Sequence, residues 1–485
     1  MPKNPLKTVW EWIDDRLGLS ELIGPMAKHP VPHNARWWYV FGSATLLAFI
    51  IQVVSGVALA FSYIPSSGEA YSSLQFITNE ASFGSFLRAM HYFGASAMVL
   101  MVGIHALQVF LFGSYKFPRE LNWVTGVLLL GLTLGMGFTG QLLRWDQTAV
   151  WSVIVAAEQA SHAPLIGDWA ARFTLGGDTV GGATLSRFFA IHVFVLPALI
   201  FAFIGGHLWL VLRHGISEPP TPGEPVDKKT YRQKYQELLH KTGQPFWPDS
   251  AWRDVVFGAA MAVVIILCAL YFGPPELGKP PNPAIVEAYP RPDWYLLWYF
   301  AVLALLPPGA ESVFIVFGPL LVGIALLLLP FLFSTGERSA LRRPWAVASV
   351  ILIVVMVGSL WRAGVYSAWS PDFEARPLPV QVVDSTDAEV NQGARLFFSK
   401  ACINCHAIEG QGGKRGPDLT AVGTRLAPEQ MTLRILNGAV NMPAFSNILK
   451  PEEVEQIVKF LQTRTKPLSS QAARRGSQMQ RTGGP

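Results

Sequence analysis

Seven long segments without a single Lys, Arg, Asp or Glu dominate the pattern of this chain. They cover residues 38–63, 89–115, 121–143, 188–212, 255–272, 312–334 and 345–361. Each is long enough to cross the hydrocarbon core of a bilayer as a helix. An eighth apolar segment, 294–310, contains Pro307 and Pro308, which break a helix, so we expect it to be re-entrant or on the surface. The pattern predicts an all-α polytopic membrane protein with seven transmembrane helices.

Lys and Arg are divided unevenly between the loops on the two sides of these spans. Segments 1–36, 113–120, 213–241 and 335–344 contain sixteen, whereas 63–85, 143–184 and 273–311 contain four. Positive loops stay on the cytoplasmic side. We therefore expect a bacterial inner-membrane protein with its N-terminus in the cytoplasm and, after seven spans, its C-terminal part outside. The net charge of +5 reflects these loops and does not indicate nucleic-acid binding.

The sequence Cys402-Ile-Asn-Cys405-His406 follows the last span. C-x-x-C-H is the attachment motif of a c-type haem, in which both thiols bind the porphyrin covalently and the histidine binds iron. A chance match or a redox dithiol is the alternative interpretation. Only three cysteines occur in the chain, which excludes a disulfide scaffold. Haem is attached to such motifs outside the cytoplasm, in agreement with the predicted orientation.

Two of the predicted spans each carry a pair of histidines. His91 and His105 are fourteen residues apart, and His192 and His207 are fifteen apart. About four helical turns separate each pair, so both imidazoles lie roughly on one face at two depths. The two spans run in the same direction, so His91 would face His192 near the outer surface and His105 would face His207 near the inner one. Isolated buried histidines are the alternative, but ionisable residues inside a membrane are usually functional. The pattern predicts two bis-histidine haems.

Four glycines repeat at the same interval in the first and third spans. They are Gly42 and Gly56, and Gly126 and Gly140. Alone, such glycines are typical of helix packing. Together with the histidines they predict two slots in which a flat macrocycle approaches the backbone. Arg88 and Arg187, just before His91 and His192, would neutralise haem propionates at the outer mouth, or are ordinary interfacial arginines.

Residues 388–466 have the pattern of a small class I cytochrome c, between a linker at 371–387 and a polar tail at 467–485 that we expect to be disordered. Helices are predicted over 390–399 and 451–464. Resemblance to that class places the carbonyl of Pro417 on His406. It also makes Met442 the sixth ligand, with Met431 as the alternative. His/Met ligation gives a higher reduction potential than bis-histidine ligation.

Several stretches resemble cytochrome b of the quinol:cytochrome c oxidoreductases. They are FLRAMHYFGASAMVLMVGIH, FPRELNWVTG, GFTGQLLRWDQ, TLSRFFAIHVFVLP and HGIS. Residues 1–217 resemble the four-helix cytochrome b of the chloroplast type, and residues 250–370 resemble its three-helix companion subunit, here continuous with it. The resemblance implies a low-potential haem on His91 and His192 and a high-potential haem on His105 and His207. It also implies quinol oxidation beside the first and quinone reduction beside the second.

The quinol-site motif departs from the family pattern. The family carries Pro-Glu-Trp-Tyr, whereas this chain has Pro-Asp-Trp-Tyr from residue 292. The resemblance implies that Asp293 accepts a quinol proton beside Tyr295, with Glu287 as a nearby substitute. Residue 144 is Arg where the family usually has Pro. The chloroplast type holds an extra haem through a cysteine that is Val40 here, so we expect no extra haem.

We therefore expect a fused subunit of a quinol:cytochrome c oxidoreductase, with a di-haem domain at 1–217, a three-helix domain with the quinol-site loop at 218–370, two haems b and one haem c. The resemblance implies that one quinol electron passes through a Rieske iron–sulfur protein to haem c, while the other crosses the b haems to quinone, coupled to proton translocation. The chain lacks a Rieske ligand set, so that protein is a required partner, beside the quinone pool, a soluble cytochrome c or terminal oxidase, and a second copy in a dimer.

Arg213 and His214 are candidate inner-side groups or interfacial anchors. Two alternatives remain: a membrane anchor linking quinone to a peripheral dehydrogenase, and a tethered, non-catalytic electron shuttle.

Overall fold

The computed structural model describes residues 5–177, 180–281, 291–306, 308–366, 378, 385–412, 416–438, 442, 445–446 and 449–466. Within them the regular secondary structure is almost entirely helical, as the hydrophobic pattern predicts. The two short sheets that are described have two strands each. Glu287, most of the predicted linker and the whole predicted tail lie outside the described residues.

Seven described helical segments are long and apolar enough to cross a membrane, which confirms the predicted fold class. They are α3 (Phe41–Ala60), α5 (Gly84–Leu111), α6 (Glu120–Leu142), the segment Gly182–His214, α12 (Ala251–Phe272), α14 (Pro308–Leu332) and α15 (Pro344–Tyr366). The segment Gly182–His214 consists of α9 (Gly182–Ala190), a wide π-type turn (Ile191–Val195) and α10 (Leu196–His214). It begins six residues before the apolar run 188–212, because the helix continues into polar positions beyond that run.

The eighth apolar segment forms a short helix and not a span. A turn at Trp294–Leu296 leads into α13 (Leu297–Leu305), which ends just before the proline pair, and α14 begins at Pro308. Nine residues of α-helix rise only about 14 Å, less than half the thickness of the hydrocarbon core. The prediction that this segment is not an eighth span is confirmed.

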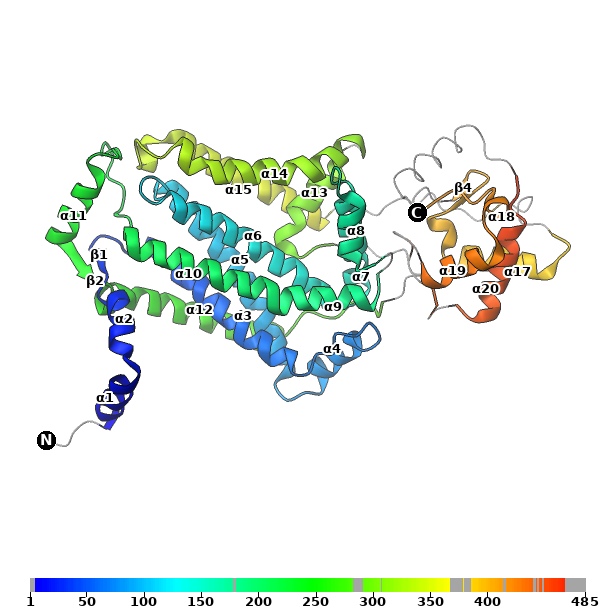
Figure 1. Ribbon diagram of the computed structural model, residues 1–485, viewed down its shortest axis with the longest axis horizontal. Coiled ribbons are helices and arrows are strands. Elements are labelled where there is room, and N and C mark those ends of the chain that lie inside the picture. The colour runs from blue at the N-terminus through cyan, green and yellow to red at the C-terminus, as the bar shows by residue number, and fades with distance from the viewer. Residues whose placement is uncertain are drawn as a thin grey trace.

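The long helices form one elongated bundle (Figure 1). Helix α3 packs on α5, α6 packs on α10, α12 packs on both α3 and α5, and α14 packs on α6. One buried cluster joins Phe49 of α3, Met98 of α5, Ile200 of α10 and Ile265 of α12. The three-helix part is therefore packed directly against the four-helix part.

The loops gather at two opposite ends of this bundle. At one, the α11 end, residues 113–119, 215–245 and 333–343 meet around α11 (Tyr231–Thr242), and Val226 pairs with Gly336. At the other, the α7 end, are α4 (Ala70–Asn79), α7 (Gln147–Ser161), α8 (Gly167–Leu175) and the loop after α12, whose Gly278 carbonyl accepts a hydrogen bond from Tyr71. These are the two sets of loops that the Lys and Arg count separates.

Two buried cations join the parts of the bundle at the α11 end. Lys116 donates to the carbonyls of Phe333 and Thr335, just after α14. Arg343 donates to the last carbonyls of α5. The final carbonyls of a helix have no partner within the helix and carry partial negative charge, so a cation is favourable there. Each cation thus stabilises a helix end in the other part of the chain.

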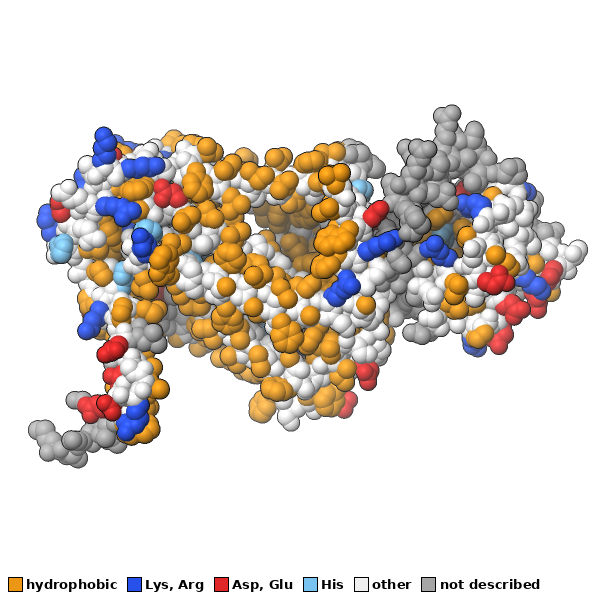
Figure 2. Space-filling model, viewed as in Figure 1, with side chains coloured by type: hydrophobic (Ala, Val, Ile, Leu, Met, Phe, Trp, Pro, Cys, Tyr) orange, Lys and Arg blue, Asp and Glu red, His pale blue; other side chains and the backbone are white. Residues whose placement is uncertain are grey.

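The surface between the two ends is apolar. Figure 2 shows hydrophobic side chains over the bundle, with Lys and Arg gathered around α11. No residue in the most hydrophobic stretch of Ala310–Leu332 is buried. Such a surface suits a lipid environment, in which helices satisfy their backbone polar groups internally.

Shorter elements precede the first span. Helix α1 (Pro5–Leu17) exposes Trp10, Trp12 and Leu17, and α2 (Leu19–Ala27) follows it. Strand β1 (Pro30–Pro32) then pairs antiparallel with β2 (Gly243–Pro245), which leads through the turn Phe246–Ser250 into α12. The pairing places the start of the four-helix part beside the start of the three-helix part.

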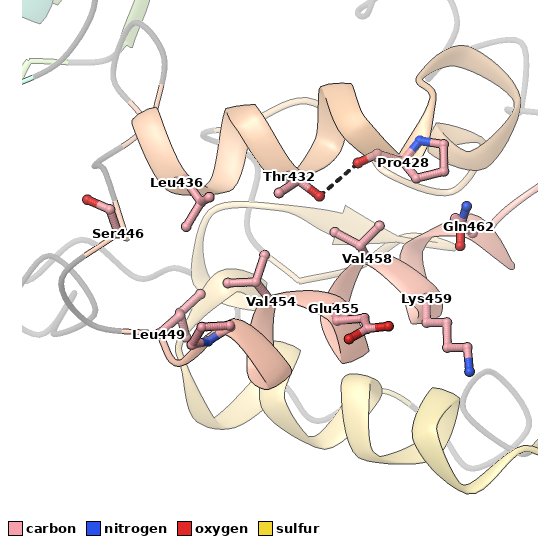
Figure 3. A pocket seen from close by; sticks show the side chains of 11 residues that line it. Pro428, Thr432, Leu436, Ser446, Leu449, Val454, Glu455, Val458, Lys459 and Gln462 are labelled. Atoms are coloured by element: carbon pink, nitrogen blue, oxygen red, sulfur yellow. Dashed lines mark hydrogen bonds between the residues drawn. The ribbon is translucent and has the colours of Figure 1, made fainter.

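The C-terminal part has a hydrophobic core of its own. Helices α17 (Ala388–Ser399) and α20 (Pro451–Gln462) cross, with the rings of Phe397 and Phe460 5.8 Å apart. Between them lie β3 (Ala407–Ile408), β4 (Gln411–Gly412), α18 (Val422–Arg425) and α19 (Pro428–Asn437). All the buried members of this core cluster come from residues 390–461. A groove of about 540 Å³ separates α19 from α20, lined by side chains such as Leu436, Val454 and Lys459 (Figure 3).

Candidate haem-binding and quinol sites

The structure brings together the two histidines that the sequence predicts near the outer surface; they are called the outer pair below, and His105 with His207 the inner pair, after that predicted orientation. His91 on α5 faces His192 in the turn Ile191–Val195, with ring centroids 6.3 Å apart and ring planes at 74°. Two imidazole–metal bonds of about 2 Å each, together with the two ring radii, span about 6 Å. The separation therefore fits one metal ion bound between the two rings.

Each of the four glycines lies against one of the four histidines. A Cβ atom added to Gly42 would lie 3.3 Å from the His105 ring, and one added to Gly56 would lie 3.1 Å from the His91 ring. On the other helix, a Cβ added to Gly126 would lie 3.7 Å from His207, and one added to Gly140 would lie 2.7 Å from His192. Helix α3 thus faces the imidazoles of α5, and α6 faces those of the segment Gly182–His214, at both depths. A side chain at these positions would occupy the space beside the imidazole, as expected for a slot that admits a macrocycle.

Hydroxyl groups orient three of the four imidazoles. The contacts to Nδ1 are Ser55 Oγ to His91 at 2.9 Å, Thr139 Oγ1 to His192 at 3.0 Å and Thr125 Oγ1 to His207 at 2.8 Å. Each hydroxyl also donates to the carbonyl four residues earlier in its own helix. Since a hydroxyl has only one hydrogen, it must accept from Nδ1–H. This tautomer leaves the Nε2 lone pair free for iron.

Sequence reasoning missed these three hydroxyls. The signal was present, because Ser55, Thr125 and Thr139 each come directly before a glycine of the slot. They lie on the helix that faces the histidine, so only the pairing of the helices shows their role.

The unequal spacing of the two histidine pairs has a backbone explanation. Fourteen residues of α-helix are about 40° short of four full turns, and fifteen are about 60° beyond them. His91 and His105 lie in the continuous helix α5, whereas His192 lies in the wide turn between α9 and α10. Such a turn takes up one extra residue. His192 and His207 therefore lie on one face of their helical segment, opposite His91 and His105, although they are fifteen residues apart.

Gly140 provides a direct test of the slot. Gly140→Val is expected to remove the outer haem, because even a Cβ at this position would lie 2.7 Å from the His192 ring. The purified protein should then contain about one haem b per haem c by difference spectroscopy. Gly131→Val is the matched control, since Gly131 is on the same helix and, apart from that helix's own backbone, no described atom lies within 4 Å of its added Cβ. Normal haem content in Gly140→Val would contradict the slot.

The two arginines predicted at the outer mouth differ in their surroundings. Arg88 is buried and donates to Thr78 at 3.0 Å and to the carbonyl of Pro275 at 2.7 Å. Arg187 is exposed, donates to the carbonyl of Phe173 at 3.1 Å and lies over its ring. Arg88 therefore also ties the loop after α12 to α4. Neutralisation of propionates by either residue stays a prediction.

The C-x-x-C-H motif lies at the edge of the C-terminal core. His406 Nδ1 lies 2.9 Å from the carbonyl of Pro417, the contact expected from the sequence. Burial lowers the pKa of His406, which favours the neutral imidazole that binds a metal through Nε2. Cys402 and Met442 pack against the core partly buried, whereas Met431 is fully buried within α19. This placement agrees with Met431 as a packing residue, and the ligand role of Met442 stays a prediction.

The Pro-Asp-Trp-Tyr segment lies beside the outer slot. Tyr295 packs on Gly137, one turn from Gly140 on α6, and its hydroxyl donates to Asp293 at 3.4 Å. The backbone N–H of Asp293 donates to the side chain of Gln141, also on α6, at 3.0 Å. Burial raises the pKa of Asp293, an effect that the positive charge of Arg144 opposes. A carboxylate with a raised pKa can accept and release a proton more easily.

Arg144 replaces the family's proline without leaving its charge isolated. Its Nε lies 3.9 Å from Asp146 Oδ2. Asp146 is buried, caps α7 by accepting from the N–H of Ala149, and accepts from the N–H of Gly278. Asp146 therefore has a structural role. Among the described residues, Asp293 is the carboxylate that Tyr295 contacts.

A carboxylate near the inner slot was not expected from the sequence. Asp254, in the first turn of α12, accepts a short hydrogen bond of 2.5 Å from Ser43, the residue after Gly42. The contact joins residues 211 positions apart, so no local pattern predicts it. The predicted inner groups lie elsewhere: Arg213 is exposed and stacks on Trp209, and the carbonyl of His214 accepts from Arg119.

Comparisons with known proteins agree with this arrangement. The family described as Cytochrome b/b6/petB matches residues 26–215, which include all four histidines and all four glycines. The cytochrome b subunit of menaquinol:cytochrome c reductase from Bacillus subtilis is 41% identical over 222 residues, covering 44% of this chain and 99% of that protein. The chain belongs to the cytochrome b/b6 family. Cytochrome b6 of Heliobacterium modesticaldum is 43% identical over 210 residues, covering 43% of this chain and 99% of that protein.

Two further matches extend beyond the four-helix part. The family described as cbb3-type cytochrome c oxidase subunit III matches residues 388–461. A solved structure titled hyperthermophilic respiratory Complex III matches with a TM-score of 0.63 and 30% identity, covering 74% of this chain and 92% of that one. This cytochrome b is therefore a membrane protein fused to a C-terminal cytochrome c domain, and the two families imply haem b and haem c.

Proposed function

We propose that the chain is the fused cytochrome b–cytochrome c subunit of a quinol:cytochrome c oxidoreductase. Two matched pairs of imidazoles, each facing a pair of helix glycines at a different depth of one bundle, carry this proposal. They provide places for two haems b, on His91 with His192 and on His105 with His207. Haem bound at these places would supply one-electron transfer across the membrane.

Asp293 and Tyr295 would bind and deprotonate quinol beside the outer pair. Oxidation of a quinol to quinone releases two electrons and two protons, so the site needs a group that accepts a proton from the hydroxyl. Asp293 is the described carboxylate there, and the Tyr295 hydroxyl and Gln141 hold it in place. With the α7 end outside the cytoplasm, the protons would be released on the outer side.

Asp293→Asn is expected to slow quinol oxidation by about 10²-fold, because an amide cannot accept the proton. In the native protein the rate should rise with pH through the raised pKa of Asp293, since only the ionised form is a base. The variant should lack this acidic limb and keep all haem spectra. Asp168→Asn, an exposed carboxylate at the same end, is the control. An unchanged rate in Asp293→Asn would transfer the role to Glu287 or to water.

Asp254 would supply protons to quinone on the inner side. It is partly buried at the α11 end and linked through Ser43 to the slot of His105. Asp254→Asn is expected to slow reoxidation of the inner haem by quinone by about 10²-fold, measured by stopped-flow spectroscopy after quinol reduction. Asp249→Asn, at the same end and without such a link, should reoxidise normally. Equal rates in all three proteins would exclude Asp254.

The remaining partners are those that the resemblance to quinol:cytochrome c oxidoreductases implies. The second quinol electron would pass to a separate Rieske iron–sulfur protein, then to the haem on Cys402 and Cys405 with His406 and Met442 as ligands, and then to a soluble cytochrome c or terminal oxidase. A dimer is the expected assembly. The cytochrome c domain lies beyond the α7 end of the bundle, the end where Asp293 lies (Figure 1). Oxidation site and acceptor would therefore be on one side of the membrane.

Isolation of the native complex tests the proposal. We expect a co-purifying iron–sulfur subunit, two haems b per haem c, and quinol-dependent reduction of all three haems that outer-site inhibitors block. Reduction that such inhibitors leave unchanged would instead favour a membrane anchor that connects quinone to a peripheral dehydrogenase.

A further inference from the structure

We propose that hydroxyl groups set the order of the two haem b potentials by binding the imidazole Nδ1–H groups. Both outer imidazoles have such a partner, whereas only one of the two inner imidazoles does. The inference rests on the proposed haem ligation by these histidines, and it assigns Ser55, Thr139 and Thr125 as positioning residues.

The asymmetry arises from one position in the sequence. A hydroxyl residue precedes the slot glycine at Ser55-Gly56, Thr125-Gly126 and Thr139-Gly140, but the fourth glycine follows Phe41. Phe41 has no hydroxyl, and its ring packs against Trp38 and Phe257. His105 lies opposite this position. Its Nδ1 is buried and has no hydrogen-bond partner among the residues that the structure describes.

The hydrogen bond acts on iron through the ring. When Nδ1–H donates to an oxygen atom, electron density moves towards Nε2, and the imidazole becomes a more basic ligand. A more basic ligand stabilises ferric over ferrous iron and lowers the reduction potential. Two such bonds on the outer haem and one on the inner haem would place the outer potential below the inner one. An electron would then pass inward from the quinol side without further driving force.

Burial and nearby charges also change a haem potential. A test must therefore compare variants at one site that differ by a single hydroxyl. Thr139→Val and Thr125→Val keep the shape of the side chain and remove the oxygen. Thr133→Val is the control on the same helix, because Thr133 is buried and, among the described residues, its hydroxyl bonds only to the Leu129 carbonyl.

Phe41 permits the reverse experiment. Phe41→Thr would place a hydroxyl one residue before Gly42, the arrangement found at the other three slots. Valine has nearly the same shape as threonine but no hydroxyl. Phe41→Val therefore controls for the loss of the aromatic packing of Phe41. The difference between these two variants measures the hydroxyl alone.

Redox titration of the purified protein, followed at the two haem b bands, tests the inference. Thr139→Val and Ser55→Ala should raise the outer potential, Thr125→Val should raise the inner one, and Phe41→Thr should lower the inner one relative to Phe41→Val. A hydrogen bond of this kind changes an equilibrium by up to about tenfold. The ratio of reduced to oxidised haem at a fixed ambient potential should change by up to that factor, or about 59 mV. Ser55→Thr should restore the native outer potential.

The outcomes separate the two proposals. A native protein with fewer than two non-covalent haems would overturn the proposed haem ligation. If both haems b are present and neither potential differs between the native protein and the variants Ser55→Ala, Thr139→Val and Thr133→Val, this inference is overturned. The proposed haem ligation would then still stand. A shift in Thr133→Val as large as that in Thr139→Val would also overturn it, because the effect would then not depend on contact with an imidazole.

Discussion

Replacing His192 by leucine is expected to halve the haem b content and to abolish quinol-driven reduction of the haem b that remains. His192 and His91 face each other across 6.3 Å, so the variant leaves iron with one imidazole in the outer slot. Loss of a direct ligand should exceed the 10- to 100-fold effects typical of residues behind the ligands. Difference spectroscopy after quinol addition measures both quantities.

The control for this experiment is His162→Leu. His162 is exposed at the end of α7 and is not part of either pair. It should retain two haems b per haem c and the native rate of reduction. If His192→Leu retained both haems b, the proposed outer pair would be wrong, and the four-histidine arrangement would have to be abandoned as a haem site.

The double substitution Cys402→Ser and Cys405→Ser is expected to abolish covalent haem. Both thiols would form the bonds to the porphyrin, so the denatured polypeptide should no longer show haem staining on a gel. The haem b content should stay at two per chain, because the buried residues of the cytochrome c core all come from that domain. Quinol would still reduce the b haems, but transfer to a soluble acceptor should fall to the background rate.

Cys268→Ser serves as the matched control. Cys268 lies on α12, remote in sequence from the C-x-x-C-H motif, and is a free cysteine. It should keep covalent haem and full transfer to the acceptor. Covalent haem that persisted in the double variant would mean that the motif is not the attachment site.

The sequence was sufficient for the features that follow helical periodicity. The fourteen-residue intervals of Gly42 with Gly56 and of His91 with His105 correspond to nearly whole turns, so residues on one face could be paired before the structure was known. The spans followed from the length of the uncharged runs. The proline pair after Leu306 correctly excluded an eighth span.

Features that depend on contacts between distant segments could not be predicted. Ser43 binds Asp254 across 211 positions, and Ser55 binds His91 across 36. A hydroxyl inside a helix usually bonds to its own backbone, so Ser and Thr in a span do not indicate a partner. In the sequence, the wide turn at His192 is visible only as the fifteen-residue interval between His192 and His207. The extra residue could be explained only by comparison with the fourteen-residue interval in the regular helix α5.

The contacts at the α11 end bear on why the two membrane parts are joined at all. Lys116 and Arg343 hold helix ends across the boundary between them, and one buried cluster is shared by α3, α5, α10 and α12. Relatives of little more than 200 residues match the four-helix part over 99% of their length. The four-helix part therefore also occurs as a separate chain in these relatives. What the unbroken chain guarantees is stoichiometry: every cytochrome b is made with one three-helix partner and one cytochrome c, so ribosomes never release the parts in unequal numbers.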